Sequence, residues 1–127
     1  MPRDSNVAAV VALLKNMSGL GGISPTPIPD NAPMPYITVK QIRWDKLQTF
    51  SGSSGVGPAI MQVDCYDKDY EAADAIRRAA GLILDAPALS SSGVTIQGSN
   101  HFADHDLYDD DRQLHQCITR YRIWFEV

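Results

Sequence analysis

The segment CITRYRIWFEV (117–127) constrains the fold more than any other part of the chain. Its side chains alternate in character with a period of two, which is typical of a strand whose two faces meet different surroundings. One face would carry Thr119, Tyr121, Ile123, Phe125 and Val127, and the other Arg120, Arg122, Trp124 and Glu126. Because a strand must share its backbone hydrogen bonds with neighbours, the segment predicts a sheet.

Three further segments have the composition of strands. They are YITVKQI (36–42), AIMQVDCY (59–66) and the shorter GVTIQGS (93–99), all rich in β-branched or aromatic residues. In the second of them, Ala59, Met61, Val63 and Cys65 fall on one face, and Ile60, Gln62, Asp64 and Tyr66 on the other. The glycine–serine stretch FSGSSGVG (50–57) predicts a flexible loop or hairpin tip between two strands.

Two segments have the 3.6-residue period of amphipathic helices. The first covers about residues 6–17, with Ser5 as the expected cap and a stripe of Val7, Val10, Val11 and Leu14. The second covers about 70–84, capped by Asp69. Its expected core stripe is Ala72, Ala75, Ile76, Ala79, Ala80 and Ile83, with Glu71, Asp74, Arg77 and Arg78 facing outward.

The order of these elements predicts one α+β domain over residues 1–127. We expect a small antiparallel or mixed sheet of four strands, covered on one face by two helices and joined by long loops. Residues 18–35 hold five prolines and three glycines, so they are expected to form an irregular arm or connection. Residues 99–116 are expected to form an acidic loop.

The sheet face turned away from the helices would mix apolar, aromatic and charged side chains. Tyr, Trp and Arg are common anchors of protein interfaces, so this face suggests a contact with another subunit or partner. The residues expected there are Ile60, Tyr66, Arg120, Arg122 and Trp124. The alternative is an ordinary solvated face with two stray aromatic residues.

The stretch HFADHDLYDDD (101–111) raises the question of a metal site. A small metal-dependent enzyme could use His101, His105 and Asp106, since H-x-x-x-H on a helix places both imidazoles on one side. However, a run of aspartates is a poor helix former, there is no HExxH motif, and the glycine of a calcium loop is missing. We therefore expect a solvated loop carrying Asp104, Asp106, Asp109, Asp110 and Asp111, with no metal, cofactor or catalytic residue.

Charge and cysteine content narrow the possible functions further. A net charge of −4 argues against a protein that clamps nucleic acid, although it allows one that nucleic acid merely passes. Cys65 and Cys117 are too sparse for a disulfide framework, which favours a reducing cytoplasm. No apolar run approaches the roughly 20 residues of a membrane-spanning helix, so no membrane partner is expected.

Several segments together resemble the tail-completion or tail-terminator proteins of long-tailed bacteriophages. These are PYITV (35–39), the loop SGSSG (51–55), AIMQVDCYDKDYEAADAI (59–76) and the final RYRIWFEV (120–127). The positions that carry the resemblance best are Gln62, Asp64, Tyr66, Tyr70, Glu71 and Ala72. The similarity extends over about residues 35–84 and 117–127, which is well over half of the chain.

The resemblance implies a structural protein rather than an enzyme. Members of this family form a ring, expected to be hexameric, that caps the tail tube, ends its polymerisation and joins it to the head connector. Its partners would be further copies of itself, the tail tube protein, the connector or neck protein, and DNA that passes without specific binding. The protein would be assembled in the bacterial host cytoplasm and reside in the tail–neck region of the virion, with the acidic loop facing the lumen or a neighbouring subunit. A head–tail adaptor of similar size is the alternative within the same setting.

Overall fold

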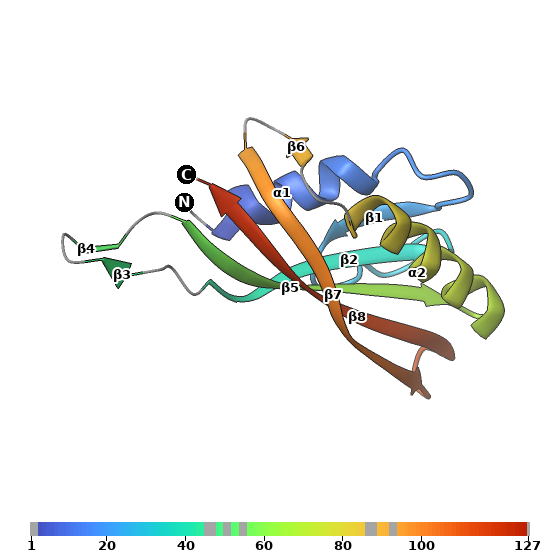
Figure 1. The fold of residues 1–127 in the computed structure, drawn as a ribbon. Helices are drawn as coiled ribbons and strands as arrows, with labels where there is room; N and C mark the ends of the chain where they lie inside the picture. The colour runs from blue at the N-terminus through green and yellow to red at the C-terminus, as the bar shows by residue number, and fades with distance from the viewer. Residues whose placement is uncertain are drawn as a thin grey trace.

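The computed structural model describes residues 3–44, 48–49, 52–53, 56–85, 89–91 and 94–126. These residues form two helices and a main sheet, and Figure 1 shows that the sheet is strongly twisted. The helices are α1 (Arg3–Leu14) and α2 (Tyr70–Leu84). The strands are β1 (Gly22–Pro25), β2 (Tyr36–Trp44), β3 (Gln48–Thr49), β4 (Gly52–Ser53), β5 (Val56–Asp67), β6 (Leu89–Ser91), β7 (Val94–Asp109) and β8 (Leu114–Glu126).

The main sheet is mixed and has the strand order β1-β2-β5-β8-β7-β6. Only the β1–β2 pair is parallel, and the other pairs are antiparallel. The α+β class is therefore confirmed, but the sheet has six strands rather than four. The two unexpected strands, β1 and β6, are short edge strands whose sequences are too brief to show an alternating pattern.

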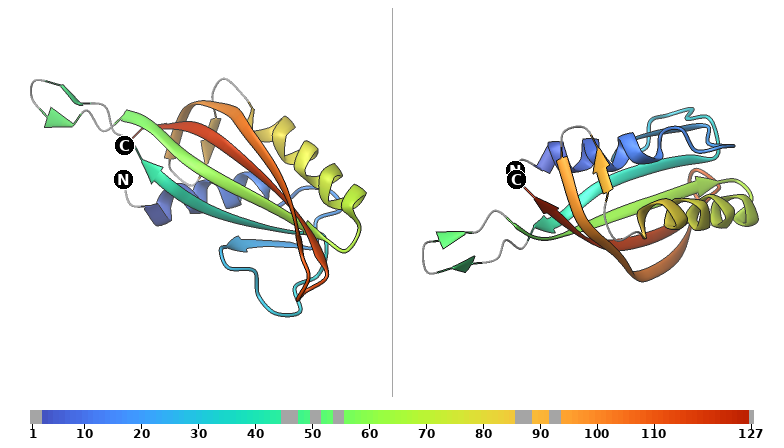
Figure 2. Two further views of the ribbon diagram at one scale, coloured as in Figure 1. Left: turned by 90° about the horizontal axis from the view of Figure 1, so that it is seen from below. Right: turned by 45° about the horizontal axis from the view of Figure 1, so that its top comes forward.

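Both helices lie on the same face of the sheet, as the right-hand view of Figure 2 shows. Between them and the sheet lies one core that includes Val10, Leu14, Ile37, Val63 and Tyr121. Neither helix in the described residues has the length and apolar character needed to cross a membrane.

Helix α2 occupies the expected residues, but α1 does not. Asp69 caps α2 by accepting a hydrogen bond from the backbone N–H of Glu71 (3.3 Å), as predicted. Its buried stripe is Ala73, Ile76, Ala80 and Leu84, so Ile76 and Ala80 are buried as predicted, whereas Ala73 and Leu84 take the place of the other predicted residues. Arg77, which was predicted to face outward, instead pairs with Asp106 of β7. Helix α1 begins at Arg3, so Ser5 lies within its first turn and is not its cap.

The acidic stretch is a strand, and its assignment to a loop over 99–116 was wrong. Strand β7 continues to Asp109 and pairs with β8 along its whole length, with two bulges. A tight turn at residues 110–113 then leads into β8, which begins at Leu114. The aspartates adopt a strand here because β8 satisfies the backbone and distant side chains bind the carboxylates, which overrides their local preference for turns.

The proline-rich segment is partly regular and partly a cover for the sheet. Its residues 22–25 form β1, which pairs with Tyr36–Val39 of β2. The following residues cross to the face opposite the helices, where Ile28 packs with Tyr36, Tyr66 and Leu114. The Gly21 N–H donates a hydrogen bond to the Pro35 carbonyl (2.7 Å) at the start of the segment. The Pro33 carbonyl lies so close to Gly21 that a side chain would not fit there.

The described part of the glycine–serine stretch confirms a hairpin. Gln48–Thr49 pairs with Gly52–Ser53, whereas residues 50–51 and 54–55 lie outside the described residues. This hairpin projects from one end of the sheet, and the β7–β8 turn lies at the other end (Figure 2).

Candidate functional site

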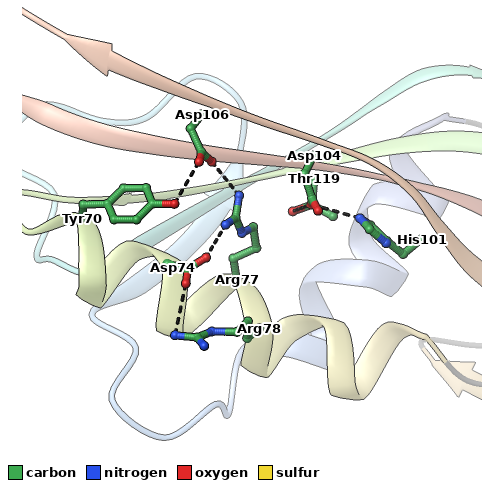
Figure 3. Close-up of polar contacts among 8 residues, drawn as sticks. All are labelled: Tyr70, Asp74, Arg77, Arg78, His101, Asp104, Asp106 and Thr119. Carbon is green, nitrogen blue, oxygen red and sulfur yellow. Dashed lines mark hydrogen bonds and ion pairs between the residues drawn. The ribbon is translucent and has the colours of Figure 1, made fainter.

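Asp106 of β7 is bound by side chains of α2 (Figure 3). Asp106 accepts hydrogen bonds from the Tyr70 hydroxyl (2.9 Å) and from Arg77 Nη1 (2.6 Å). Arg77 also pairs with Asp74, which in turn contacts Arg78 (3.1 Å). Partial burial raises the pKa of Asp106, but the bonds from Tyr70 and Arg77 outweigh that effect and hold the pKa below its ordinary value. Asp106 is therefore a tether between β7 and α2.

The two histidines of the H-x-x-x-H spacing lie on opposite faces of the sheet. His101 pairs across the strands with Tyr121, on the helix side, and donates to Asp104 (2.9 Å), which also accepts from Thr119 (3.2 Å). His105 pairs with Ile118, whose side chain belongs to the opposite face. The strand geometry thus separates the imidazoles that a helix would have brought together. Within the described residues, no three metal-ligating side chains gather at one place.

The turn between β7 and β8 is organised by an aspartate. The Asp109 side chain accepts hydrogen bonds from the backbone N–H groups of Asp111 (3.0 Å) and Arg112 (3.2 Å). Asp110 and Asp111 are exposed at the tip. The five aspartates predicted as one acidic loop therefore have different surroundings, since three are engaged within the subunit and two point to solvent.

A polar ladder crosses the sheet face opposite the helices, which we call the helix-free face. Asp64 is only 3 % exposed and accepts hydrogen bonds from the side-chain amides of Gln62 (2.9 Å) and Gln116 (3.1 Å). Arg120 donates to Gln62 Oε1 (3.0 Å), which extends the ladder to β8. Burial raises the pKa of the Asp64 carboxyl, and the two amide bonds offset only part of this effect.

The residues predicted as an interface are divided between the interior and the surface. Tyr66 (8 % exposed) and Ile60 (5 % exposed) are buried within the subunit, Tyr66 against the residues that follow β1. Arg120 is exposed, and Arg122 and Trp124 are half-buried. The guanidinium of Arg122 lies 4.9 Å from the ring centroid of Phe102, a residue that the sequence had not marked for this face.

Several large apolar side chains are exposed at the surface. The sequence patterns had not predicted them as surface or interface residues. Among the described residues they include Ile42 on β2, Leu82 on α2, and Phe102, Leu107 and Tyr108 on β7. Tyr108 and Tyr70 both make ring contacts with His115, with centroid distances of 4.8 and 5.7 Å. The interleaving of apolar and aromatic residues with aspartates in HFADHDLYDDD was the signal in the sequence for these positions.

The two cysteines lie opposite each other on β5 and β8. Cys65 and Cys117 are paired in register, and both are free and buried. Burial raises the pKa of both thiols, to about 11 for Cys117. Thiols that are buried and protonated at neutral pH are poor nucleophiles, so both cysteines are part of the packed interior rather than reactive groups.

Comparisons with known proteins point to one family. The model of the family described as "Tail completion protein gp17" matches residues 7–126. Among solved structures, a chain in the "Virion of native gene transfer agent (GTA) particle" has a similar fold, with a TM-score of 0.72 and 15% sequence identity. That similarity covers 98% of this chain and 96% of the other chain. The comparison with curated proteins found no match.

Proposed function

The chain belongs to the tail completion protein gp17 family, and from that premise we propose that it is a ring-forming subunit at a head–tail junction. As a family member it is a structural component of a phage-type tail. In the proposed role, a ring of six copies caps the tail tube, ends its polymerisation and joins it to the head connector. DNA passes through the ring without specific binding.

The surface of the subunit supports a role in assembly rather than catalysis. Exposed apolar side chains on β2 and β7, such as Ile42 and Phe102, are available for contacts with other proteins. The side chains that could act in catalysis are not available for it. Both thiols are buried, and the carboxylates of Asp104 and Asp106 are bound by neighbouring side chains. We therefore propose that the protein is not an enzyme.

The exposed part of the helix-free face is the proposed contact with the tail tube or the connector. Arg120, Arg122 and Trp124 reach the surface of β8 there, beside Phe102 of β7. Arginine and tryptophan are frequent anchors of interfaces because each combines a large contact area with a polar group. The observation that carries the whole proposal remains the family match over residues 7–126.

The test is to image the purified protein and to measure its molar mass, both alone and in the presence of tail tubes. Light scattering and negative-stain microscopy should find a six-membered ring, free or on one end of each tube, and tube growth should stop when the protein is added. A ring that binds connector protein but not tubes would instead favour the adaptor role. A protein that stays monomeric and binds neither would contradict the proposal.

The contribution of the helix-free face is tested by Arg120→Ala with Trp124→Ala. We expect the double variant to form rings but to bind tubes or connector at least tenfold more weakly, because arginine and tryptophan anchors contribute much of the binding free energy of an interface. Leu82→Ala, at an exposed site on α2 away from this face, is the control. Unchanged binding by the double variant would show that this face meets neither partner.

A further inference from the structure

The cations of the helix-free face form a row across three strands. Lys40 of β2 pairs in register with Gln62 of β5, which in turn pairs with Arg120 of β8. Residues that are opposite each other in register share a face, so Lys40, Gln62 and Arg120 lie side by side. Arg122 follows two residues after Arg120 on β8 and is on the same face. A chain with a net charge of −4 thus carries a positive row on this face.

The nearest carboxylate does not balance this row. Asp64 is buried beside it and binds the side-chain amides of Gln62 and Gln116. Lys40 and Arg120 act on Asp64 only through the electrostatic field, and one carboxylate cannot neutralise three cations. Among the described residues, no ion pair joins Lys40, Arg120 or Arg122 to a carboxylate. The row therefore keeps a surplus of positive charge.

A hollow of about 250 Å³ lies beside the end of this row, between β7 and β8. It is lined by Ala103, Asp104, His105, Ile118 and Arg120. The Asp104 carboxylate is bound to His101 and Thr119, whose side chains are on the helix side of the sheet, so it does not compensate Arg120. The hollow thus combines apolar walls with a cation and can receive an apolar side chain.

Exposed apolar side chains flank the hollow on the same face. Phe102 lies against the guanidinium of Arg122, and Leu107 pairs across the strands with Gln116, whose side chain reaches Asp64 on this face. Both Phe102 and Leu107 are exposed. Cations and apolar groups therefore alternate across the β7–β8 part of the helix-free face.

We propose that this face binds an acidic segment of the tail tube protein, in which carboxylates are interspersed with apolar side chains. The carboxylates would pair with Lys40, Arg120 and Arg122, and an apolar side chain would enter the hollow over Ile118. The tail tube is the source of the segment because the chain belongs to a tail completion family. The inference rests on the proposed function and names the chemistry of its partner.

A protein segment suits this face better than DNA does. The backbone phosphates of a duplex could pair with the cations, but they offer no apolar side chain to the hollow or to Phe102 and Leu107. In addition, Asp110 and Asp111 are exposed at the end of the same two strands, where they repel phosphates.

The pairing of charges is tested by carbodiimide cross-linking of the protein bound to tail tubes. This reagent joins a lysine amine directly to a carboxylate that touches it. Mass spectrometry should find Lys40 linked to an aspartate or glutamate of the tube protein. Lys40→Arg keeps the positive charge but has no amine to couple, so this variant should bind tubes normally and give no link at position 40.

The contribution of the charges to binding is tested with Lys40→Gln combined with Arg120→Gln. We expect the affinity for tubes to fall at least tenfold at low salt, and the remaining binding to depend less on salt. The matched control is Lys15→Gln with Arg78→Gln, which removes two exposed cations from the helices on the other face. The control should bind tubes as the unaltered protein does.

The hollow is tested without a change of charge by Ala103→Leu, whose larger side chain would fill it. We expect weaker binding to tubes at every salt concentration, because the apolar side chain of the partner loses its place. Circular dichroism and ring assembly of each variant show whether it is folded.

Three results would overturn the inference. Normal tube binding by both the charge variant and Ala103→Leu, with no link from Lys40, would exclude an acidic segment at this face but leave the proposed function intact. A Lys40 link to the connector protein instead of the tube would overturn the assignment to the tube. Binding of duplex DNA to the unaltered ring that the charge variant alone abolishes would assign the face to nucleic acid. If the unaltered protein bound neither tubes nor connector, the proposed function would fail as well.

Discussion

Asp64 is buried on the helix-free face, and its hydrogen-bond donors are amides rather than cations. Gln62 and Gln116 supply the bonds, and burial raises the pKa of the carboxyl. A carboxyl group whose pKa is higher in the folded state binds its proton more tightly there than in the unfolded chain. The ionised form of Asp64 therefore costs stability, and this cost appears as the pH rises from the ordinary value of 3.8 through the raised pKa.

Replacement of the Asp64 carboxyl by a neutral amide should remove its contribution to the pH dependence of stability. For Asp64→Asn, we expect the free energy of unfolding, relative to that of the unaltered protein, to increase with pH across this window and to level off above it. Urea unfolding of both proteins at a series of pH values between about 3.5 and 7 measures this difference. A difference that stays constant with pH, or that decreases, would contradict the assignment of a raised pKa to Asp64.

At the scale of elements, the tether between α2 and β7 should contribute to stability. Arg77 and Arg78 are neighbours on α2, but the side chain of Arg77 is 15% exposed and bridges Asp74 and Asp106, whereas that of Arg78 is 73% exposed. We expect Arg77→Met to lower the free energy of unfolding by about 1–3 kcal/mol, because two carboxylates lose a charged donor. Chemical denaturation measures the change.

Arg78→Met is the matched control for this prediction. It removes one exposed ion pair at spacing i,i+4, so we expect a change of no more than about 0.5 kcal/mol. Equal losses for the two variants would mean that the bridge to Asp106 does not hold the strand, and that the effect comes from the helix surface alone.

The elements differ in how far the sequence could predict them. Residues 59–66 and 117–127 follow strict alternation, and α2 has a capping aspartate before a periodic run, so local signals were sufficient. Strand β7 could not be recognised beyond residue 99, because its aspartates are stabilised by Arg77, Tyr70 and Thr119, which are far away in the sequence.

The candidate site was harder to predict than the fold. The predicted interface residues were selected because they share one face of the sheet, and the alternation along the strands assigned them to that face correctly. However, Tyr66 is buried, because residues that follow β1 pack over it. Nothing in a proline-rich stretch specifies which face of a sheet it will cover.

At the scale of the whole molecule, the charged tip of the β7–β8 hairpin bears on the proposed passage of DNA. Asp110 and Asp111 are exposed there, while Asp109 holds the turn and should be left in place. If the six tips face the channel, their negative charge repels phosphates and lowers retention of DNA. We expect Asp110→Lys with Asp111→Lys to form rings that retain DNA, and the retention should weaken steeply as salt is added.

The control is a variant with the same change of net charge at another place. Asp30→Lys with Asp85→Lys replaces two exposed carboxylates that lie outside the hairpin. Filter binding or co-sedimentation of assembled rings with double-stranded DNA, over a range of salt concentrations, compares the two variants. Stronger retention by the tip variant alone places the tips at the channel, because net charge is matched. Equal retention by both would show that the effect is one of total charge and that the tips point elsewhere.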